Sequence, residues 1–415
     1  MKQRWQSLRK KADERFGRMS DAFFRHTGWA LPVMAVAILF LAVVARIGAF
    51  EHVSGDITYF LRPWYTRFYE EGFGALGENF GDYTPAYMLL LYLLSLFRFA
   101  PDSFGFLAGL KTVSLLFDVA SAVALYMILR TLGRTREVSL IGGGVLLFLP
   151  TVFLNSSYWG QCDSIWCCFL LYSLYFALRR RDLLVWIFWG FSFSFKLQAV
   201  FFLPFLILLC LDRRLKCRYA PAAVLSSFVL YVPALVAGRS LGDVLSVYVG
   251  QTASSYQQLS LNAPSLYALF AKVFEEYPRL TLYAVAFCIF SVGALLALFY
   301  RKRVALSSAE LVTVALLFAI LVPFLLPRMH ERYFFLADLL GCLYLFAAPR
   351  RRFVGALPVI ASLFAYIPYL FPGKMEREEA VVFGALLLLA AVLLLLDEVR
   401  HLLRRTAEGK EQNGA

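Results

Sequence analysis

Charged residues are scarce in this chain, and so are the patterns that build disulfide or metal frameworks. Only 17% of its 415 residues are Asp, Glu, Lys or Arg, and histidine occurs four times. The seven cysteines lie in or beside apolar runs, and no spacing of Cys and His matches a metal site. Neither a disulfide framework nor a structural metal centre is therefore expected. Internal repeats and low-complexity linkers are also absent from the sequence.

Apolar runs dominate what is present. Hydrophobic residues make up 60% of the chain, its mean hydropathy is +0.66, and many runs can cross about 30 Å of hydrocarbon. The sequence therefore predicts an all-α, multi-pass membrane protein. Twelve spans are expected, at about residues 29–48, 106–129, 138–153, 163–178, 183–195, 197–211, 219–237, 280–300, 308–326, 333–348, 353–371 and 380–403.

Basic residues set the predicted orientation of these spans. The net charge of +13 would fit a nucleic-acid partner, but 28 of the 41 Lys and Arg fall in segments that twelve spans place on one side of the membrane. Such a bias marks the cytoplasmic side. Both termini are therefore predicted to be cytoplasmic, and no nucleic-acid partner is expected. Counting residues 88–97 as a thirteenth span would destroy the bias, so residues 84–97 are predicted to form a helix that lies in or dips into the outer interface.

This topology divides the chain into five parts. A basic cytoplasmic tail at 1–28 is expected to lead into a retained first helix and not to be a cleaved signal peptide. A module of seven spans follows at 29–238 and includes a long exterior loop at 49–105. A second exterior loop is expected at 239–279, five further spans at 280–404, and a cytoplasmic tail at 405–415.

The first exterior loop carries more carboxylates and aromatics than a simple connection needs. Asp56 follows Gly55 just beyond the first span, where a carboxylate would meet a lipid-borne headgroup. A general base has to reach its substrate at such a place. The alternative is that Asp56 only caps a helix predicted over residues 57–71.

Three later segments place polar residues on the same predicted face. The turn around Trp159, Gln161 and Asp163 separates two spans, and Lys196 with Gln198 separates the next pair. An intramembrane lysine costs about 2.5 to 3.5 kcal/mol on insertion scales, so an anion is expected near it. Either a ligand or an ion pair with Asp163 or Asp118 satisfies that expectation.

Another exterior turn, at residues 327–334, gathers Arg328, His330, Glu331 and Arg332. Arginine can hold a phosphate through two hydrogen bonds and histidine can add a third. The alternative is a solvated turn with an internal pair of Glu331 and Arg332. The loop at 239–279 is rich in amides, which suit sugar hydroxyls, but an interfacial helix without a ligand fits it equally well.

Four of these motifs, in this order, resemble the GT-C glycosyltransferases that use polyprenyl-phosphate sugars. Gly55-Asp56 followed by Asp82-Tyr83-Thr84-Pro85 resembles their first luminal loop, with Thr84 in place of a proline. The segments at 155–164 and 195–198 are similar to motifs of the endoplasmic-reticulum glucosyltransferases of N-glycan assembly. Trp159-Gly160-Gln161-Cys162-Asp163 is closer to bacterial relatives of the second mannosyltransferase of GPI-anchor synthesis. The turn at 327–334 resembles the family's His-Glu-Lys motif.

The resemblance implies a GT-C helical bundle and an inverting hexosyltransferase, with mannose favoured. It implies that Asp56 is the general base. Donor-phosphate contacts are expected from Lys196, Arg328, His330, Arg332 and Lys111. Sugar or acceptor contacts are expected from Trp159, Gln161, Asp163, Gln198, Asp82, Tyr83, Glu331, Gln257 and Asn262. Asp118 is expected to be structural.

The expected partners are a polyprenyl-phosphate sugar donor, a glycolipid, glycan or protein acceptor, and the lipid bilayer. No cofactor is required, although Asp82 or Glu51 would be candidate ligands if a divalent metal were used. Short loops favour a bacterial cytoplasmic membrane over the endoplasmic reticulum, with the site on the extracytoplasmic face. Two alternatives stay open: a lipid-linked sugar transporter or flippase, and a polysaccharide ligase or polymerase with a diphosphate donor.

Overall fold

The computed structural model describes residues 29–252, 259–270, 280–304, 306–347 and 350–413. Two compact units are present, residues 1–45 and 46–415. The described part of the first unit belongs to a single helix, α2 (Ala30–Phe50), whose last residues belong to the second unit. The second unit contains every other element and all the predicted site residues in described segments. Both predicted tails, residues 1–28 and the side chains of 405–415, lie outside the description.

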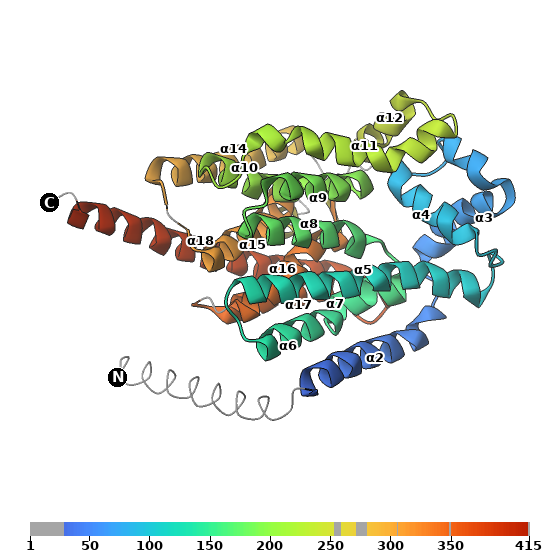
Figure 1. Cartoon of the computed structure of the whole chain (residues 1–415), viewed down its shortest axis with the longest axis horizontal. Coiled ribbons are helices and arrows are strands. Elements are labelled where there is room, and N and C mark those ends of the chain that lie inside the picture. Colours follow the sequence, from blue (N-terminus) through green and yellow to red (C-terminus); the bar gives the residue numbers. More distant parts are fainter. Residues whose placement is uncertain (1–28, 253–258, 271–279, 305, 348–349, 414–415) are drawn as a thin grey trace. The chain divides into compact units, whose positions relative to one another are not determined.

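The second unit is a bundle of helices with short connections (Figure 1). Its elements up to the second exterior loop are η1 (Ile57–Leu61), α3 (Arg62–Glu71), η2 (Gly72–Gly77), α4 (Pro85–Ser95), α5 (Phe104–Thr131), α6 (Arg136–Leu147), α7 (Pro150–Phe153), η3 (Leu154–Trp159), α8 (Asp163–Leu178), α9 (Asp182–Phe195), η4 (Leu197–Phe202), α10 (Leu203–Leu211), η5 (Cys217–Tyr219) and α11 (Pro221–Val236). The later ones are α12 (Leu241–Thr252), β1 (Ser260–Leu261), η6 (Leu266–Phe270), α14 (Leu280–Lys302), α15 (Ser308–Leu325), β2 (Met329–His330), η7 (Glu331–Phe334), α16 (Phe335–Phe346), η8 (Arg352–Gly355), α17 (Ala356–Leu370) and α18 (Arg377–Asn413).

Within the described residues, seven helical segments are long and apolar enough to cross a membrane, and an eighth is formed if a bent pair counts as one span. The bent pair joins α6 to the α7–η3 segment at an angle of 47°. This is the composition of a multi-pass membrane protein. The seven are Ala30–Phe50, Phe104–Thr131, Cys217–Val236, Leu280–Lys302, Ser308–Leu325, Arg352–Leu370 and Arg377–Arg404.

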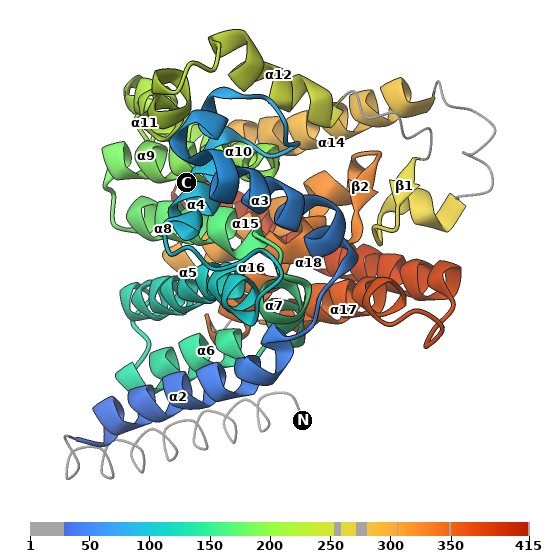
Figure 2. The same cartoon turned by 90° about the vertical axis from the view of Figure 1, so that its right-hand side faces the viewer.

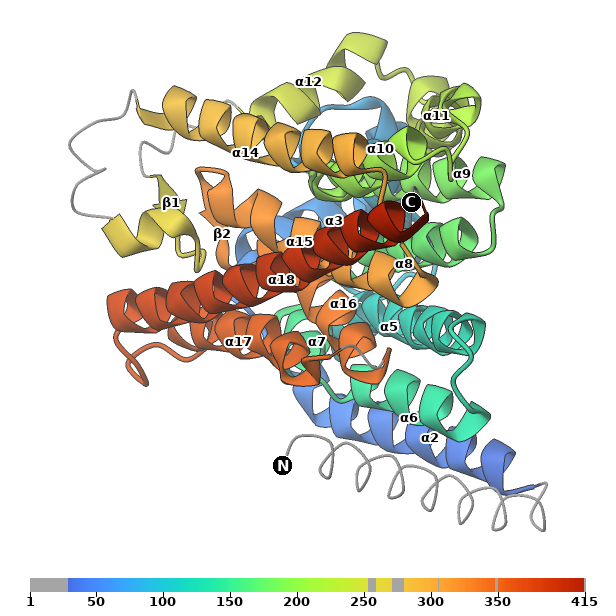
Figure 3. The same cartoon turned by 90° about the vertical axis from the view of Figure 1, so that its left-hand side faces the viewer.

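The most buried helices of the bundle are α15 and α16. Every residue of α15 from Leu311 to Leu325 is buried, and Figures 2 and 3 show α15 and α16 surrounded by other helices. Close packing elsewhere depends on small residues. A Cβ atom at Gly190 of α9 would lie 2.2 Å from the carbonyl oxygen of Ala223 on α11, so only glycine permits these two helices to approach so closely.

The predicted helix over residues 57–71 is confirmed, as η1 followed by α3. The segment predicted at 84–97 is also helical. Its helix α4 has 11 residues, a length of about 16 Å, which is too short to cross a membrane. Thr84 begins the helix and its hydroxyl donates to the carbonyl oxygen of Phe195, 3.2 Å away, which ties α4 to the end of α9.

The polar segment at 155–162, which the sequence predicts as a turn between two spans, is largely helical in the structure. It continues the helical course of α7 as η3, and Asn155, Ser156 and Ser157 have no exposed surface. Ser156 donates to Asp118 over 2.6 Å, and Asp118 lies 3.5 Å from Arg46. The structural role expected for Asp118 agrees with these contacts. Broken helices of this kind occur at membrane depth where protein buries their polar groups.

Part of the segment at 239–279, predicted as the second exterior loop, pairs with the His330 turn. Strands β1 and β2 are parallel, with Ser260 opposite Met329 and Leu261 opposite His330. Asn262 also bridges to His330, and the backbone N–H of Arg328 donates to the carbonyl oxygen of Leu259 over 2.7 Å. Figure 2 shows β1 and β2 side by side. Residues far apart in sequence are thereby joined at one end of the bundle.

Candidate active site

Asp56 precedes η1 but does not cap it. Its backbone is helical and its side chain makes no capping hydrogen bond. Ser54 performs that function, since its hydroxyl accepts from the backbone N–H of Ile57 over 3.3 Å. The alternative that Asp56 is only a helix cap is therefore wrong. Its carboxylate is therefore not used to cap the helix.

Three donors from two distant segments hold the Asp56 carboxylate. Its Oδ2 accepts from the indole N–H of Trp159 over 3.0 Å and from the side-chain amide of Gln161. Its Oδ1 accepts from the hydroxyl of Tyr369 over 3.0 Å. Two carboxylate oxygens offer about four acceptor positions, so these contacts leave one position, on Oδ1. The side chain is 16% exposed, which gives a ligand access to it.

Local helix geometry delivers these donors. Wide i→i+5 turns form both η1, directly after Asp56, and η3, directly before Gly160, and such turns are rare and frequent at functional sites. Gly160 adopts a φ of 83°. A Cβ atom there would lie 2.9 Å from the side chain of Ile57. Glycine is therefore needed for η3 to end against η1, which places Trp159 and Gln161 beside Asp56.

Tyr83 sets the orientation of the Gln161 amide. Its hydroxyl donates to Gln161 Oε1 over 3.2 Å, so the NH₂ group of the amide faces Asp56. Burial raises the pKa of Tyr83 above its usual value, which keeps the hydroxyl protonated and able to donate. The backbone carbonyl of Gln161 in turn accepts from Ser114 over 2.8 Å. The predicted loop around residues 82–85 therefore supports the carboxylate through Gln161.

Arg332 lies beside this carboxylate. Its Nη1 is 3.9 Å from Asp56 Oδ2 and 3.2 Å from Glu331 Oε1, and its Nε is 3.8 Å from Asp163 Oδ2. Its guanidinium also lies over the ring of Trp159, 5.4 Å from the ring centroid. The Nε–H is buried without a hydrogen-bond partner among the described residues, which costs about 1 to 3 kcal/mol unless a ligand or water accepts from it.

Asp163 connects Arg332 to Lys196. The Lys196 ammonium donates to Asp163 Oδ1 over 2.6 Å, and the indole N–H of Trp166 donates to the same oxygen over 3.0 Å. Asn155 donates to Oδ2 over 3.0 Å. The anion expected near Lys196 is therefore the carboxylate of Asp163, with which it forms an ion pair. Its ammonium also lies 5.4 Å from the ring centroid of Tyr83, so Lys196 remains part of the same cluster.

His330 does not add a positive charge to the cluster. Burial, together with the charges of Arg332 and Lys196, lowers its pKa to about 3, against a smaller opposing effect of Asp163. Neutral histidine donates one hydrogen bond, so a polar contact with a ligand remains possible while the charge expected of it does not. The internal pair of Glu331 and Arg332, considered as an alternative for this turn, does form.

Lys111 has a structural role instead of the predicted contact with a phosphate. Its buried ammonium donates to the carbonyl oxygens of Ala49, Phe50 and His52 over 2.8, 3.2 and 2.7 Å. An ammonium has three N–H donors, and all three are engaged. Lys111 therefore caps the carboxyl end of α2, where a cation also interacts favourably with the helix dipole.

Four residues predicted to touch sugar instead have their polar groups engaged by protein. Trp159, Gln161, Asp163 and Glu331 are all buried, and each contacts Asp56, Lys196 or Arg332 directly. They position the charged groups, and the expectation of sugar contacts is corrected accordingly.

The other predicted sugar contacts differ in their surroundings. Gln198 is buried, and its side-chain oxygen has no hydrogen-bond partner among the described residues. Asp82 is exposed next to Tyr83, and Asn262 lies against His330. Gln257 lies outside the described residues. Within the part of the chain that is described, no three His, Cys, Asp or Glu side chains are grouped as a metal site requires.

Tyr369 was not anticipated, because its helix α17 shows no polar motif. It lies near the end of α17, after Pro368, and its ring stacks on Trp159 with centroids 4.6 Å apart. The sequence pattern that could have indicated Tyr369 as a site residue is Tyr366-Ile367-Pro368-Tyr369. Two tyrosines three residues apart next to a proline at the exterior end of a predicted span indicate polar partners there.

No family model matches the sequence. The chain is 26% identical over 191 residues to GPI mannosyltransferase 1 of Saccharomyces cerevisiae. The matched stretch covers 45% of this chain and 45% of the yeast protein. The chain is thus similar to a GPI mannosyltransferase over somewhat less than half the length of either protein. This relative is GPI mannosyltransferase 1, whereas the predicted resemblance of residues 159–163 is to bacterial relatives of the second mannosyltransferase of GPI-anchor synthesis.

Proposed function

We propose that this protein is a GT-C glycosyltransferase that transfers a hexose, with mannose favoured, from a polyprenyl-phosphate donor to an acceptor hydroxyl. The observation that carries the proposal is the convergence of Asp56 and Arg332, 3.9 Å apart, from segments almost 280 residues apart in sequence. The similarity to a yeast GPI mannosyltransferase supports both the reaction class and the sugar. The acceptor is a glycolipid, glycan or protein.

Asp56 acts as the general base in this proposal. The acceptor hydroxyl donates a hydrogen bond to the open position on Oδ1, and the carboxylate takes its proton as the acceptor oxygen attacks the anomeric carbon. The bond between that carbon and the phosphate oxygen breaks at the same time. The polyprenyl phosphate leaves with the bonding electrons, and because attack and departure occur on opposite sides, the anomeric configuration inverts.

Arg332 binds the departing phosphate. Its partly exposed guanidinium carries an Nε–H without a hydrogen-bond partner among the described residues, and a preorganised cation of this kind stabilises the charge that gathers on the leaving oxygen. Lys196 contributes further positive charge to the cluster, and its ammonium is held by Asp163 at 2.6 Å. Arg328 and His330 lie on the same turn, where His330 contributes a neutral hydrogen-bond donor.

The proposed topology has twelve spans with both termini in the cytoplasm. Besides the eight long spans, four shorter segments would complete the number: α8, α9, η4 with α10, and η7 with α16. Spans shorter than about 17 residues fit where the bundle thins the bilayer locally. The Asp56 cluster would then face the exterior of a bacterial cytoplasmic membrane, or the lumen if the host is eukaryotic.

Transfer from a lipid-linked sugar tests the proposal directly. Purified protein given radiolabelled polyprenyl-phosphate mannose and a membrane extract as acceptor is expected to move label into a glycolipid, glycan or protein fraction, with inverted configuration at the anomeric carbon. Polyprenyl-phosphate glucose should be used more slowly. Label that crosses sealed vesicles without forming a new glycoside would indicate a transporter instead. Transfer only from a diphosphate donor would indicate a ligase or polymerase.

The reaction is expected to proceed without a divalent cation. Arginine and lysine supply the positive charge at the phosphate. An excess of EDTA should therefore leave the rate of transfer unchanged within about twofold. Removal of an essential metal would lower the rate far more, because such a metal contributes several kcal/mol to transition-state stabilisation. The rate is measured after dialysis against chelator and again after adding Mg²⁺ or Mn²⁺. Loss of transfer that either ion restores would contradict this expectation.

Tyr369→Phe removes one hydrogen bond to Asp56 Oδ1 and leaves the ring on Trp159 in place. Because a hydrogen bond to a charged group contributes about 1.5 to 3 kcal/mol, the expected loss of kcat is about 10- to 100-fold. KM for the donor should change little, since Tyr369 contacts the base and not the cations. Tyr59→Phe, on the exposed face of η1, is the matched control. A change confined to KM would indicate that Tyr369 contacts the donor.

A further inference from the structure

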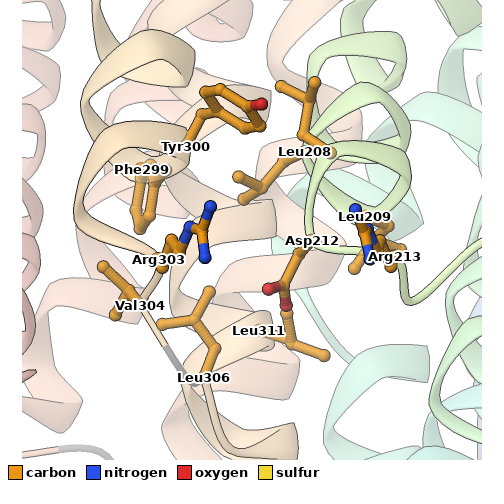
Figure 4. A pocket seen from close by; sticks show the side chains of 11 residues that line it. Leu208, Leu209, Asp212, Arg213, Phe299, Tyr300, Arg303, Val304, Leu306 and Leu311 are labelled. Carbon is orange, nitrogen blue, oxygen red and sulfur yellow. The ribbon is translucent and has the colours of Figure 1, made fainter.

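A cavity of about 250 Å³ lies between the ends of α10 and α14, with the start of α15 beside it. These are the ends remote from the Asp56 cluster, because η4 and Lys196 lie before the start of α10 and the His330 turn follows the end of α15. In the proposed topology the cavity opens at the cytoplasmic surface. Figure 4 shows Arg303 and Asp212 pointing into the space between the two helices.

The lining of the cavity is amphiphilic. Its apolar lining includes Leu208 of α10, Leu311 of α15 and Tyr300 of α14, while Arg213 and Arg303 are its basic lining residues. Tyr300 is 59% exposed, as expected of a tyrosine in the interfacial region of a membrane. Apolar walls below two cations match a molecule with an acyl or glycerol body and an anionic head.

Neither arginine forms an ion pair with a described residue, so no neighbouring carboxylate offsets its positive charge. Asp212 also lines the cavity, but its carboxylate is paired with Arg214. Further cations lie close by in the sequence, Arg301 and Lys302 on the last turn of α14 and Lys216 and Arg218 in the connection after α10. The field in the cavity is therefore positive, although a carboxylate is among its lining groups.

Helix capping explains only part of this arrangement. Arg213 lies two residues after the end of α10 and Arg303 directly after the end of α14, with φ values of 54° and 47°, and cations are favoured at helix carboxyl ends. That preference applies to each helix separately. It does not account for two such arginines, from helices about 90 residues apart in sequence, that line one cavity whose other walls are mostly apolar.

We propose that this cavity binds the phosphate of an anionic phospholipid from the cytoplasmic leaflet, between Arg213 and Arg303. Basic pockets between membrane helices on that side recognise lipid head groups. The lipid's glycerol and first acyl carbons lie against Leu208, Tyr300 and Leu311. The proposal needs the orientation of the helices but not the glycosyltransferase activity, so the two can fail independently.

Lipid binding by the purified full-length protein tests this proposal. After delipidation, phosphatidylglycerol is expected to bind and raise the Tm of the wild-type protein, whereas phosphatidylcholine and inorganic phosphate have little effect. The variant Arg213→Gln/Arg303→Gln should bind phosphatidylglycerol about 30-fold more weakly, since each basic residue near the surface contributes about fivefold. Arg136→Gln/Arg179→Gln removes two cations elsewhere on the same predicted side and should bind as the wild type does.

Equal binding by the cavity variant and the wild type would overturn the proposal, and so would an equal loss in the control variant. Equal stabilisation by inorganic phosphate would indicate a free anion as the ligand and overturn the assignment to a lipid. If the double variant aggregates, the single variants Arg213→Gln and Arg303→Gln serve instead, each with an expected weakening of about fivefold. Wild-type affinity in both single variants would also overturn the proposal.

Discussion

Asp56→Asn is expected to lower the rate of sugar transfer by about 10²- to 10⁴-fold, the contribution typical of a positioned general base. The substitution is nearly isosteric. The new amide oxygen can take the place of Oδ2 and accept from Trp159 and Gln161, while its NH₂ group donates to Tyr369, whose hydroxyl can rotate to accept. Only the charge and the ability to take a proton are lost, so the folded structure and its Tm should change little.

Glu70→Gln is the matched control for this variant, because Glu70 is an exposed carboxylate on α3 of the same loop. Transfer is measured as label moved from polyprenyl-phosphate mannose, and donor binding is measured separately. Asp56→Asn should bind the donor as the wild type does. Wild-type transfer by Asp56→Asn would remove the proposed base from the mechanism.

Arg332→Gln is expected to have the second largest effect, a loss of about 10²- to 10³-fold in kcat/KM, as when one preorganised donor to a developing negative charge is removed. Arg332→Lys keeps the charge but not the planar fork that faces Glu331, Asp56 and the phosphate together. It should therefore restore only part of the activity. Donor binding should weaken in both variants, in contrast to Asp56→Asn.

Arg67→Lys and Arg67→Gln control for the loss of an arginine on the same predicted face, because Arg67 pairs with Glu71 on the exposed side of α3. Both should transfer sugar at the wild-type rate. Full activity in Arg332→Lys would show that a point charge suffices at this position. Full activity in Arg332→Gln would exclude Arg332 from phosphate binding.

The sequence indicates candidate site residues where charged side chains stand between or beyond apolar spans. Asp56 and Arg332 lie in connections predicted on the exterior side and Lys196 separates two spans, and their close association in the structure follows from the cost of leaving such charges without partners in an apolar surrounding. The helices of the first exterior loop were also predicted with nearly correct bounds. Their signals are local, namely a turn followed by a proline at an early helical position.

Residue roles within the site could not be predicted, because they depend on which donors face which acceptors. Lys111 resembles a ligand-binding lysine until the three carbonyls at the end of α2 are seen around it. Tyr369 resembles an interfacial tyrosine until its bond to Asp56 is seen. Charge state has the same limit. The pKa of His330 depends on its burial and on Lys196, which lies far away in the sequence, as well as on the neighbouring Arg332.

The most direct test of the central claim is a structure of the Asp56→Asn protein with a polyprenyl-phosphate sugar bound. The account predicts that the phosphate contacts Arg332 and that the anomeric carbon faces residue 56, with room for an acceptor hydroxyl between them. A donor bound with its phosphate away from Arg332, or with the sugar separated from residue 56 by α17 or η3, would contradict the account.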